Sequence, residues 1–403
     1  MNPSLAAALA SVDALYLHIP FCERRCEYCD FASVAGLRGH REYVEALRAQ
    51  LRATAAALPG ITLRSIFVGG GTPGLLPPHL LRSVLDEVRS GFELAADCEV
   101  TIEANPSSTS AARATAWLEA GVNRVSLGVQ SLDADALRFL GRVHDPNRAL
   151  AALEELRAAG VPRRSADLIY GIPGLSDATW RSTVERILEY DCGHLSAYEL
   201  TVEPGTPLHA SVERGDVIPV DADTALRQHW AVVDLAEAAG YRQYEVSNFA
   251  LSGEECRHNL VYWSNGFYLA CGVGAHGHLP PAAAAALGIG AAVPESTGGR
   301  WVAVRYWHDR EPAGYVARIA VAPTAPVAGA EMVDAATAEA ERVMVGLRVR
   351  GGVLLDGRAH EEAKVLADGG LLEWDGTSAR ATRRGQELLN AVALRLVEAA
   401  SAS

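Results

Sequence analysis

The first half of the chain alternates short aliphatic or β-branched runs with longer stretches of helical periodicity. The short runs predict six strands, near residues 14–18, 65–68, 99–103, 124–128, 166–169 and 195–198. The segments between them, rich in Ala, Leu, Glu and Arg, predict helices over 43–57, 79–88, 111–119, 148–159 and 180–189. Strands and helices that alternate in this way form parallel βα units. Six such units predict an α/β fold in which the sheet curls without closing, a partial (β/α)6 barrel.

Beyond the sixth strand the pattern changes twice. A tract rich in Pro, Ala and Gly over 279–299 predicts a loop or insertion. Helical patterns then return over 335–347, 360–368 and 386–399, with a hairpin signal that starts at 371. We therefore expect a core with its extension at 1–278, a loop or insertion and connector at 279–329, and a small C-terminal helical, winged-helix-like domain at 330–403.

Charge and cysteine usage narrow the class of protein. The chain has 36 basic and 49 acidic residues, a net charge of −13, and no basic stripe. Nucleic acid is therefore not an expected partner, and the winged-helix-like domain is expected to pack or dock rather than bind DNA. Seven cysteines do not form a secreted disulfide framework. With no positively charged leader and no stretch long enough to span a membrane, a cytoplasmic protein is expected.

Three closely spaced cysteines carry the strongest chemical signal in the chain. Cys22, Cys26 and Cys29 lie in the run YLHIPFCERRCEYCDF, with a CxxxCxxC spacing. Thiolates are the ligands of [4Fe–4S] clusters, which normally take four of them. Three cysteines leave one iron open to a small molecule, and S-adenosylmethionine can chelate it through its amino and carboxylate groups. The spacing resembles the signature of the radical SAM superfamily, in which the cluster reduces this sulfonium to release a 5′-deoxyadenosyl radical.

Two simpler interpretations of these cysteines remain open from the sequence. The motif could hold a disulfide pair with a spare thiol. It could also be part of a zinc site, for which His18 is the only nearby fourth ligand. Short cysteine spacings in intracellular chains favour metals over disulfides. The default expectation for Cys98, Cys192, Cys256 and Cys271 is buried free thiols.

Further polar or glycine residues stand at the expected strand ends, where parallel α/β folds place their chemistry. The run GGGTP at 69–73 follows the second strand and allows close backbone approach, although a tight turn before a helix would look the same. Glu103 ends the third strand and calls for a ligand cation or hydroxyl if buried. Gln130 follows the fourth strand, Arg142 suits a ligand carboxylate, and Asp167 lies in the fifth. Singly, each is more typical of a cap, a salt bridge or the surface, and it is their shared strand-end position that favours a site.

A third group of residues combines histidine with aromatic side chains. It comprises YEVSNF at 244–249, CRHNLVYW at 256–263 and GVGAHGH at 272–278. Haem iron takes an axial histidine, and apolar walls hold the macrocycle. An ordinary core cluster with a hydrogen-bonded histidine explains the same pattern.

Six features of the sequence resemble, in order and spacing, the oxygen-independent coproporphyrinogen III oxidase (HemN) group of radical SAM proteins. They are the HIPFC lead-in, GGGTP, Glu103, RVSLGVQS, DLIYGIPG and HNLVYW. The likeness covers nearly the whole chain. It is closest to the HemW-like branch of haem chaperones, since HNLVYW resembles the HNxxYW motif of that branch. Asp30 and Phe31 also follow Cys29 where the oxidases have a further cysteine, and the N-terminal extension of the oxidases is not seen.

The resemblance implies a set of cofactor ligands. Cys22, Cys26 and Cys29 would ligate the cluster, and His258 would contact haem. The residues implied around S-adenosylmethionine are Tyr16, Tyr28, Gly70, Gly71, Thr72, Glu103, Gln130, Arg142, Asp167 and Thr201.

The same resemblance implies a function and an alternative. The first is a cytoplasmic chaperone that binds the cluster, S-adenosylmethionine and haem and delivers haem to acceptor proteins, with transient contact with membrane haemoproteins. The alternative is a radical enzyme that oxidatively decarboxylates coproporphyrinogen III, which the missing cysteine disfavours. A metal-stabilised scaffold without radical chemistry would bind no S-adenosylmethionine.

Overall fold

The central element of the computed structural model, which describes residues 3–289, 301–324 and 326–401, is a twelve-stranded sheet. The six predicted strands form a continuous parallel series in it and are β1 (Val12–Ile19), β4 (Thr62–Gly70), β5 (Glu93–Ala104), β6 (Arg124–Gln130), β7 (Arg163–Tyr170) and β8 (Gly193–Glu199). They pair in that order, each parallel to the next. The predicted α/β fold with six parallel βα units is confirmed.

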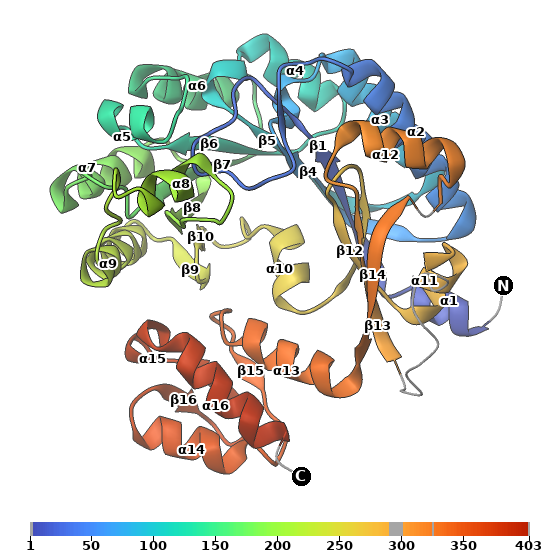
Figure 1. Ribbon diagram of the computed structural model, residues 1–403. Helices are drawn as coiled ribbons and strands as arrows, with labels where there is room; N and C mark the ends of the chain where they lie inside the picture. Colours follow the sequence, from blue (N-terminus) through green and yellow to red (C-terminus); the bar gives the residue numbers. More distant parts are fainter. Residues whose placement is uncertain (1–2, 290–300, 325, 402–403) are drawn as a thin grey trace.

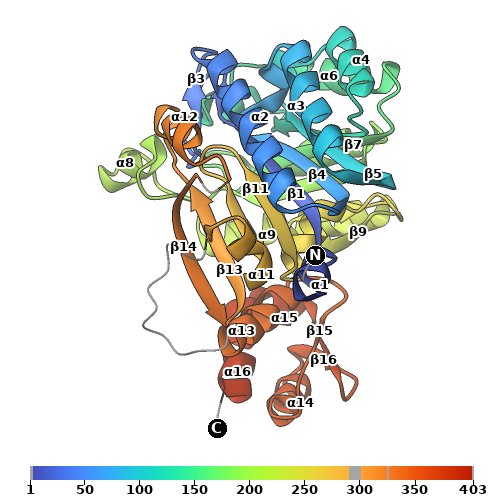
Figure 2. The same cartoon turned by 90° about the vertical axis from the view of Figure 1, so that its right-hand side faces the viewer.

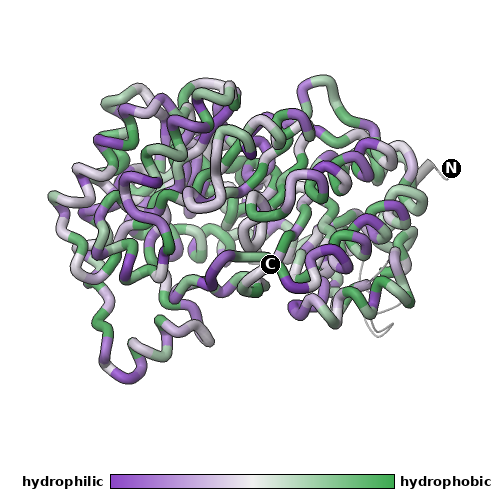
Figure 3. The backbone as a smooth tube through the Cα atoms, turned by 90° about the horizontal axis from the view of Figure 1, so that it is seen from above, coloured by the Kyte–Doolittle hydropathy of each residue, from purple (hydrophilic) through white to green (hydrophobic). Residues whose placement is uncertain are grey.

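Helices cover the outer side of these strands, as Figure 1 shows. They are α2 (His40–Ala57), α3 (Pro78–Gly91), α4 (Ala111–Glu119), α5 (Ala134–Phe139), α6 (Pro146–Ala158) and α7 (Asp177–Leu188). Serine caps begin two of them: Ser110 accepts from the Arg113 amide in α4, and Ser176 from the Thr179 amide in α7. Trp117 and Trp180 bury one face of the same two helices. Figure 3 shows hydrophobic and hydrophilic positions alternating along the helices, as one-sided packing requires.

Later segments extend the sheet at both edges. The chain continues through α8 (Pro207–Glu213), α9 (Ala222–Ala238), β9 (Arg242–Glu245), β10 (Asn248–Ala250), α10 (Arg257–Trp263), β11 (Phe267–Cys271) and β12 (His276–Leu279). At one edge β10 pairs antiparallel with β8 and β9. At the other, β11 pairs parallel with β1, so that Val12 lies beside Phe267. The N-terminal helix α1 (Pro3–Leu9) packs on α11 (Pro281–Ala286).

The expectation of a loop or insertion and connector over 279–329 does not hold for residues 281–286, 301–308, 312–321 and 327–329, which lie in regular elements. Residues 290–300 lie outside the described part of the chain, but β13 (Trp301–His308), α12 (Pro312–Val321) and β14 (Val327–Asp334) are regular elements. Strand β13 pairs antiparallel with both β12 and β14. Helix α12 packs on α2, where the fully buried Tyr315 donates to Gln50 Oε1 at 2.5 Å. Long-range pairing therefore gives this segment a structure that its composition did not indicate.

The C-terminal segment forms a small module with its own hydrophobic core, seen at the bottom of Figure 2. Its elements are α13 (Ala335–Gly346), β15 (Val353–Leu354), α14 (His360–Asp368), β16 (Leu372–Trp374), β17 (Ser378–Ala381), α15 (Arg383–Glu387) and α16 (Leu389–Ser401). The three strands pair in the order β15-β17-β16. Helices around one short hairpin sheet make this a winged-helix-like module, as predicted.

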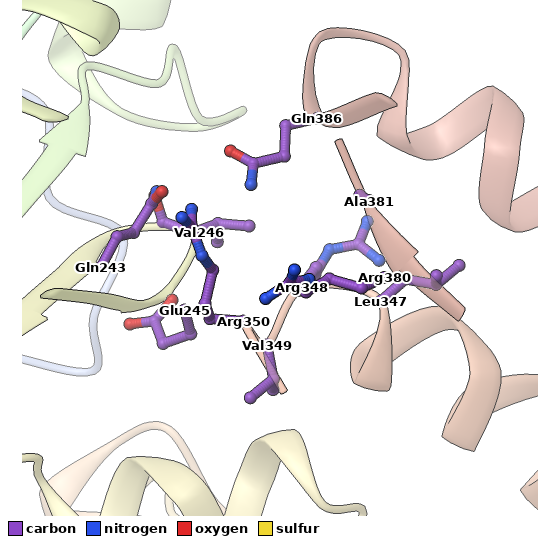
Figure 4. Close-up of a pocket in the computed structure, with 10 residues that line it drawn as sticks. All are labelled: Gln243, Glu245, Val246, Leu347, Arg348, Val349, Arg350, Arg380, Ala381 and Gln386. Atoms are coloured by element: carbon purple, nitrogen blue, oxygen red, sulfur yellow. The ribbon is translucent and has the colours of Figure 1, made fainter. Parts of the chain in front are cut away.

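The C-terminal module packs against the edge of the large sheet at β9. Glu245 of β9 forms an antiparallel bridge with Val349, and the Arg350 amide donates to the Tyr244 carbonyl at 2.9 Å. Figure 4 shows Arg348, Arg350 and other polar side chains gathered there. The cavity between them is about 10 Å³, room for one water at most. Within the described residues, no helix combines the length and apolar character needed to cross a membrane.

Candidate functional site

The three motif cysteines lie in one loop, between the carboxyl end of β1 and the start of α2. Within this cysteine loop, residues 20–39, the short strands β2 (Phe21–Cys22) and β3 (Val34–Ala35) pair parallel to each other. The Val34 amide donates to the Pro20 carbonyl at 2.8 Å. The loop is thus fixed over the carboxyl edge of the sheet. This is the edge at which the sequence predicted the functional residues to lie.

The glycine run at the carboxyl end of β4, residues 69–71, holds the cysteine loop in place. The Gly71 amide donates to the Ile19 carbonyl and the Thr72 amide to the Phe21 carbonyl, each at 2.8 Å. A Cβ on Gly71 would lie 2.7 Å from the Pro20 backbone. The Thr72 hydroxyl is 3.7 Å from Cys22 Sγ. Glycines are therefore needed here for close backbone packing, and they bring Thr72 against the first cysteine.

Replacement of Gly70 by alanine is expected to destabilise the protein by about 2–4 kcal/mol. Gly70 has φ 113°, and a Cβ would lie 2.6 Å from the buried ring of His18. Both the backbone conformation and the packing oppose a side chain. Urea unfolding of Gly70→Ala against wild type measures the difference.

Gly60→Ala is the matched control, because Gly60 has φ 85° but nothing within 4 Å of an added Cβ. It isolates the backbone cost and should lose only about 1 kcal/mol. Equal losses for the two variants would show that the contact with His18 is unimportant.

The thiols of the cysteine loop lie beside a positive charge; Cys22 is buried, and Cys26 and Cys29 are half-buried. Burial raises the pKa of Cys22 and of Cys29. Arg142 Nη1 lies 3.4 Å from Cys26 Sγ. Burial also raises the pKa of Tyr28, against the opposing effect of Arg142. The structure therefore brings Tyr28 and Arg142 to the cysteines, with a cation that stabilises a thiolate.

The alternatives of a disulfide or a zinc site have no support in the geometry. All seven cysteines are free, and Cys98, Cys192, Cys256 and Cys271 are buried, as expected. His18 cannot serve as a zinc ligand in this arrangement, because Nε2 bonds the Ala32 carbonyl at 2.8 Å and Nδ1 the Tyr16 hydroxyl at 3.1 Å. Among the described residues no three His, Cys, Asp or Glu side chains are arranged to hold a single metal ion. A four-iron cube spreads its thiolates over different irons and does not require such convergence.

Glu103 is a buried carboxylate at the carboxyl end of β5. The Gly70 amide donates to its Oε2 at 3.0 Å. Burial, and then the charge of Asp167, raises its pKa to about 8. Tyr16 of β1 is near enough for Glu103 to contribute to its raised pKa, after burial as the main cause. Glu103 and Tyr16 therefore share the space inside the curved sheet.

Asp167 stands in the same interior, held by Ser165 of its own strand β7 and by Ser126 and Ser196 of the neighbouring strands β6 and β8. Its carboxylate accepts from Ser126 at 2.8 Å, Ser165 at 2.9 Å and Ser196 at 2.8 Å. Burial raises its pKa although these hydroxyls oppose the shift. The serines were not predicted as site residues; their signal was a small polar side chain at an inward position of each strand.

Arg142 connects this interior to the cysteine loop. Its Nη2 donates to the Gly128 carbonyl at 2.9 Å and bonds Asn105, which in turn donates to Thr72 Oγ1 at 2.9 Å. Gln130 has φ 65°, an unusual value for a residue other than glycine, at the end of β6. Asn105 was not predicted; its position two residues after Glu103, beyond the same strand, was the available signal.

Two predicted residues are not part of this arrangement. Thr201 is exposed just beyond β8, where its hydroxyl bonds the Glu199 carbonyl at 3.5 Å. His258 lies in α10 and is fully buried, with Nδ1 3.0 Å from Ser65 Oγ and Nε2 2.8 Å from the Tyr262 hydroxyl. Burial lowers its pKa to about 3. This is the geometry of a hydrogen-bonded core histidine, and contact between His258 and haem stays a prediction.

The residues around the cysteine loop fit a [4Fe–4S] cluster with a polar ligand beside it. Three thiols share one loop, and the buried carboxyl of Glu103, whose pKa is raised, accepts a hydrogen bond from the Gly70 amide. Among the described residues, the buried Arg142 Nε has no hydrogen-bond partner. Buried groups of this kind indicate a site that a bound molecule completes.

Comparisons with known proteins agree with this interpretation. A family model described as the radical SAM superfamily matches residues 16–187. The chain is 40% identical over 399 residues to the heme chaperone HemW of Mycobacterium tuberculosis H37Rv, covering 97% of this chain and 96% of that protein. It is 42% identical over 271 residues to HemW of Escherichia coli K12, covering 66% of this chain and 69% of that protein.

Among solved structures, the coproporphyrinogen III oxidase HemN of Escherichia coli superposes with a TM-score of 0.79 at 20% identity, covering 98% of this chain and 92% of that one. This likeness supports the fold. The identity with HemW over nearly the whole of both chains supports a closer relationship. The chain belongs to the HemW family of radical SAM proteins.

Proposed function

We propose that this protein is a haem chaperone that binds a [4Fe–4S] cluster and S-adenosylmethionine and passes haem to acceptor proteins. The observation that carries the proposal is its 40% identity to a heme chaperone HemW across 97% of this chain. The cysteine loop and the buried polar interior support the cofactor part. We propose further that it acts in the cytoplasm and contacts membrane haemoproteins only transiently.

In this proposal Cys22, Cys26 and Cys29 hold the cluster, which when bound supplies one-electron chemistry and an open iron for S-adenosylmethionine. Arg142 stabilises the Cys26 thiolate and offers its unpartnered Nε to a ligand carboxylate. Glu103 accepts from a ligand ammonium or hydroxyl, which would lower its raised pKa and leave it ionised.

The remaining implied residues have positioning roles within the same proposal. Gly70, Gly71 and Thr72 fix the cysteine loop, and Asp167, held by its serines, stays ready to accept a hydroxyl at the sheet interior. Tyr16, Tyr28 and Gln130 line the space around the ligand. Thr201 would reach it only if the segment after β8 closes over the site.

The proposal is tested by haem transfer measured alongside oxidase activity. Cluster-reconstituted protein loaded with haem is expected to pass it to an apo-haemoprotein faster than free haem binds it, followed by visible absorbance. With S-adenosylmethionine, a low-potential reductant and coproporphyrinogen III, no protoporphyrinogen is expected by mass spectrometry, while a HemN control forms it. Product formation without haem transfer would make the protein an oxidase and refute the proposal.

A further inference from the structure

A pocket unconnected with the cysteine loop lies at the other end of the sheet. Strand β11 runs parallel to β1 and starts beside Val12, so Phe267 and Tyr268 stand at the amino end of the parallel strands. The cysteine loop follows the carboxyl end of β1. The pocket has a volume of about 190 Å³ and is lined by Tyr262, Asn265, Gly266, Tyr268, His278 and Arg305.

One histidine of this pocket has a nitrogen that nothing in the protein uses. His278 is 5% exposed, and its Nδ1 lies 2.9 Å from the Gly266 carbonyl. A carbonyl only accepts, so Nδ1 carries the proton and Nε2 presents a lone pair. Among the described residues, Nε2 is buried and has no hydrogen-bond partner. His258 differs in this respect, since both of its ring nitrogens are bonded.

The tautomer of His278 is the one that metal ligation requires. A histidine that binds a metal through one nitrogen usually donates its other N–H to a carbonyl or carboxylate, which fixes the ring. Burial also lowers the pKa of His278, which keeps the ring neutral near pH 7. A neutral, oriented imidazole with an unused Nε2 is the kind of ligand that haem iron would take from a protein.

The walls of the pocket suit one edge of a porphyrin. Tyr262 and Tyr268 supply the aromatic part of the lining, and the Tyr268 ring centroid is 6.4 Å from that of His278. Phe267, with its centroid 5.0 Å away, packs against the same imidazole but does not line the pocket. The volume is below the ~300–1,000 Å³ of pockets that enclose a whole ligand, so only part of the macrocycle would be covered. Arg305 already pairs with Glu331 and Glu341, so the propionate edge would stay in solvent. Partial cover is appropriate for a carrier that must release its cargo.

We propose that His278, through Nε2, is the protein ligand to haem iron, and that the pocket between α10, β11 and β13 receives the apolar edge of the haem. This rests on the proposed function and names the site within it. Because Nε2 is covered in the haem-free protein, a neighbouring side chain must move for iron to reach it.

The test is a titration of ferric haem into the full-length, cluster-reconstituted protein and its variants, read by visible absorbance and by electron paramagnetic resonance of the ferric iron. His278→Ala is expected to lose the histidine-ligated signal and to weaken haem binding by at least about 10–100-fold, the usual loss for a perturbed metal-ligand shell. Added imidazole should restore the signal. His276→Ala is the matched control, because His276 is exposed on the same strand and does not line the pocket.

The outcomes separate the two proposals. If wild type binds haem and His278→Ala keeps its signal and affinity, or if His276→Ala or His258→Ala alone loses the ligand signal, the assignment to His278 is overturned and the chaperone function stands. If wild type binds no haem, both fail. His278→Gln keeps a side chain of similar length that can donate to Gly266, so loss of the signal in that folded variant confirms the assignment even if the alanine variant does not fold.

Discussion

Replacement of Cys26 by serine is expected to abolish cluster binding while leaving the fold intact. Cys26 is the middle thiol of the motif and the one that Arg142 contacts, at 3.4 Å. It is partly exposed in the loop, so the smaller, more polar side chain disturbs no core packing. Two remaining cysteines cannot hold a cube that already has one open iron. S-adenosylmethionine should then lose its anchor as well.

Iron and sulfide analysis after anaerobic reconstitution measures the first effect, and calorimetry with S-adenosylmethionine the second. Wild type should hold about four irons per chain and Cys26→Ser close to none. Cys98→Ser is the control, because Cys98 is a buried free thiol of β5 outside the cysteine loop. Four irons retained in Cys26→Ser would refute the assignment of the cluster to this loop.

The parallel core of this fold was predictable because its signals are local. Each strand from β1 to β8 that belongs to a βα unit is a short buried run followed by an amphipathic helix. The boundaries of two helices, α4 and α14, are those that the periodicity of the sequence predicted. The edges of the sheet were not predictable in this way. Strand β11 pairs with β1 about 250 positions earlier in the chain, and β13 follows a tract whose composition indicates a loop. Their conformation depends on tertiary pairing rather than on local pattern.

The residues of the candidate site divide in the same way into those that the sequence could predict and those that it could not. Cys22, Glu103 and Arg142 could be named because each is an unusual residue in a motif or at a strand end. Ser126 and Ser196 beside Asp167 could not, since only the register of β6, β7 and β8 brings them to that carboxylate. His258 and His278 look alike in the sequence. They differ in which ring nitrogens are occupied, and only the packing of α10 on β4 and of β12 beside Gly266 decides that.

Replacement of Glu103 by glutamine is expected to stabilise the protein at alkaline pH while weakening S-adenosylmethionine binding. Burial and Asp167 raise the pKa of Glu103 to about 8 from an ordinary 4.5. Between these values the native state holds a proton that the unfolded state has lost. By linkage, this group's contribution to the free energy of unfolding falls as pH rises from about 4.5 to about 8, by an amount on the order of 5 kcal/mol at most.

Glutamine has the same shape and can still accept from the Gly70 amide, but it has no charge to bury. Above pH 8 Glu103→Gln should therefore unfold at higher urea than wild type, and the difference should vanish near pH 4.5. Glu93→Gln, at the exposed start of the same strand, should leave the pH profile unchanged. A buried carboxylate that destabilises the ligand-free protein is explained by ligand binding, because a ligand ammonium or hydroxyl offsets the cost of the buried charge. Glu103→Gln that is less stable than wild type at every pH would show instead that Glu103 is a structural residue.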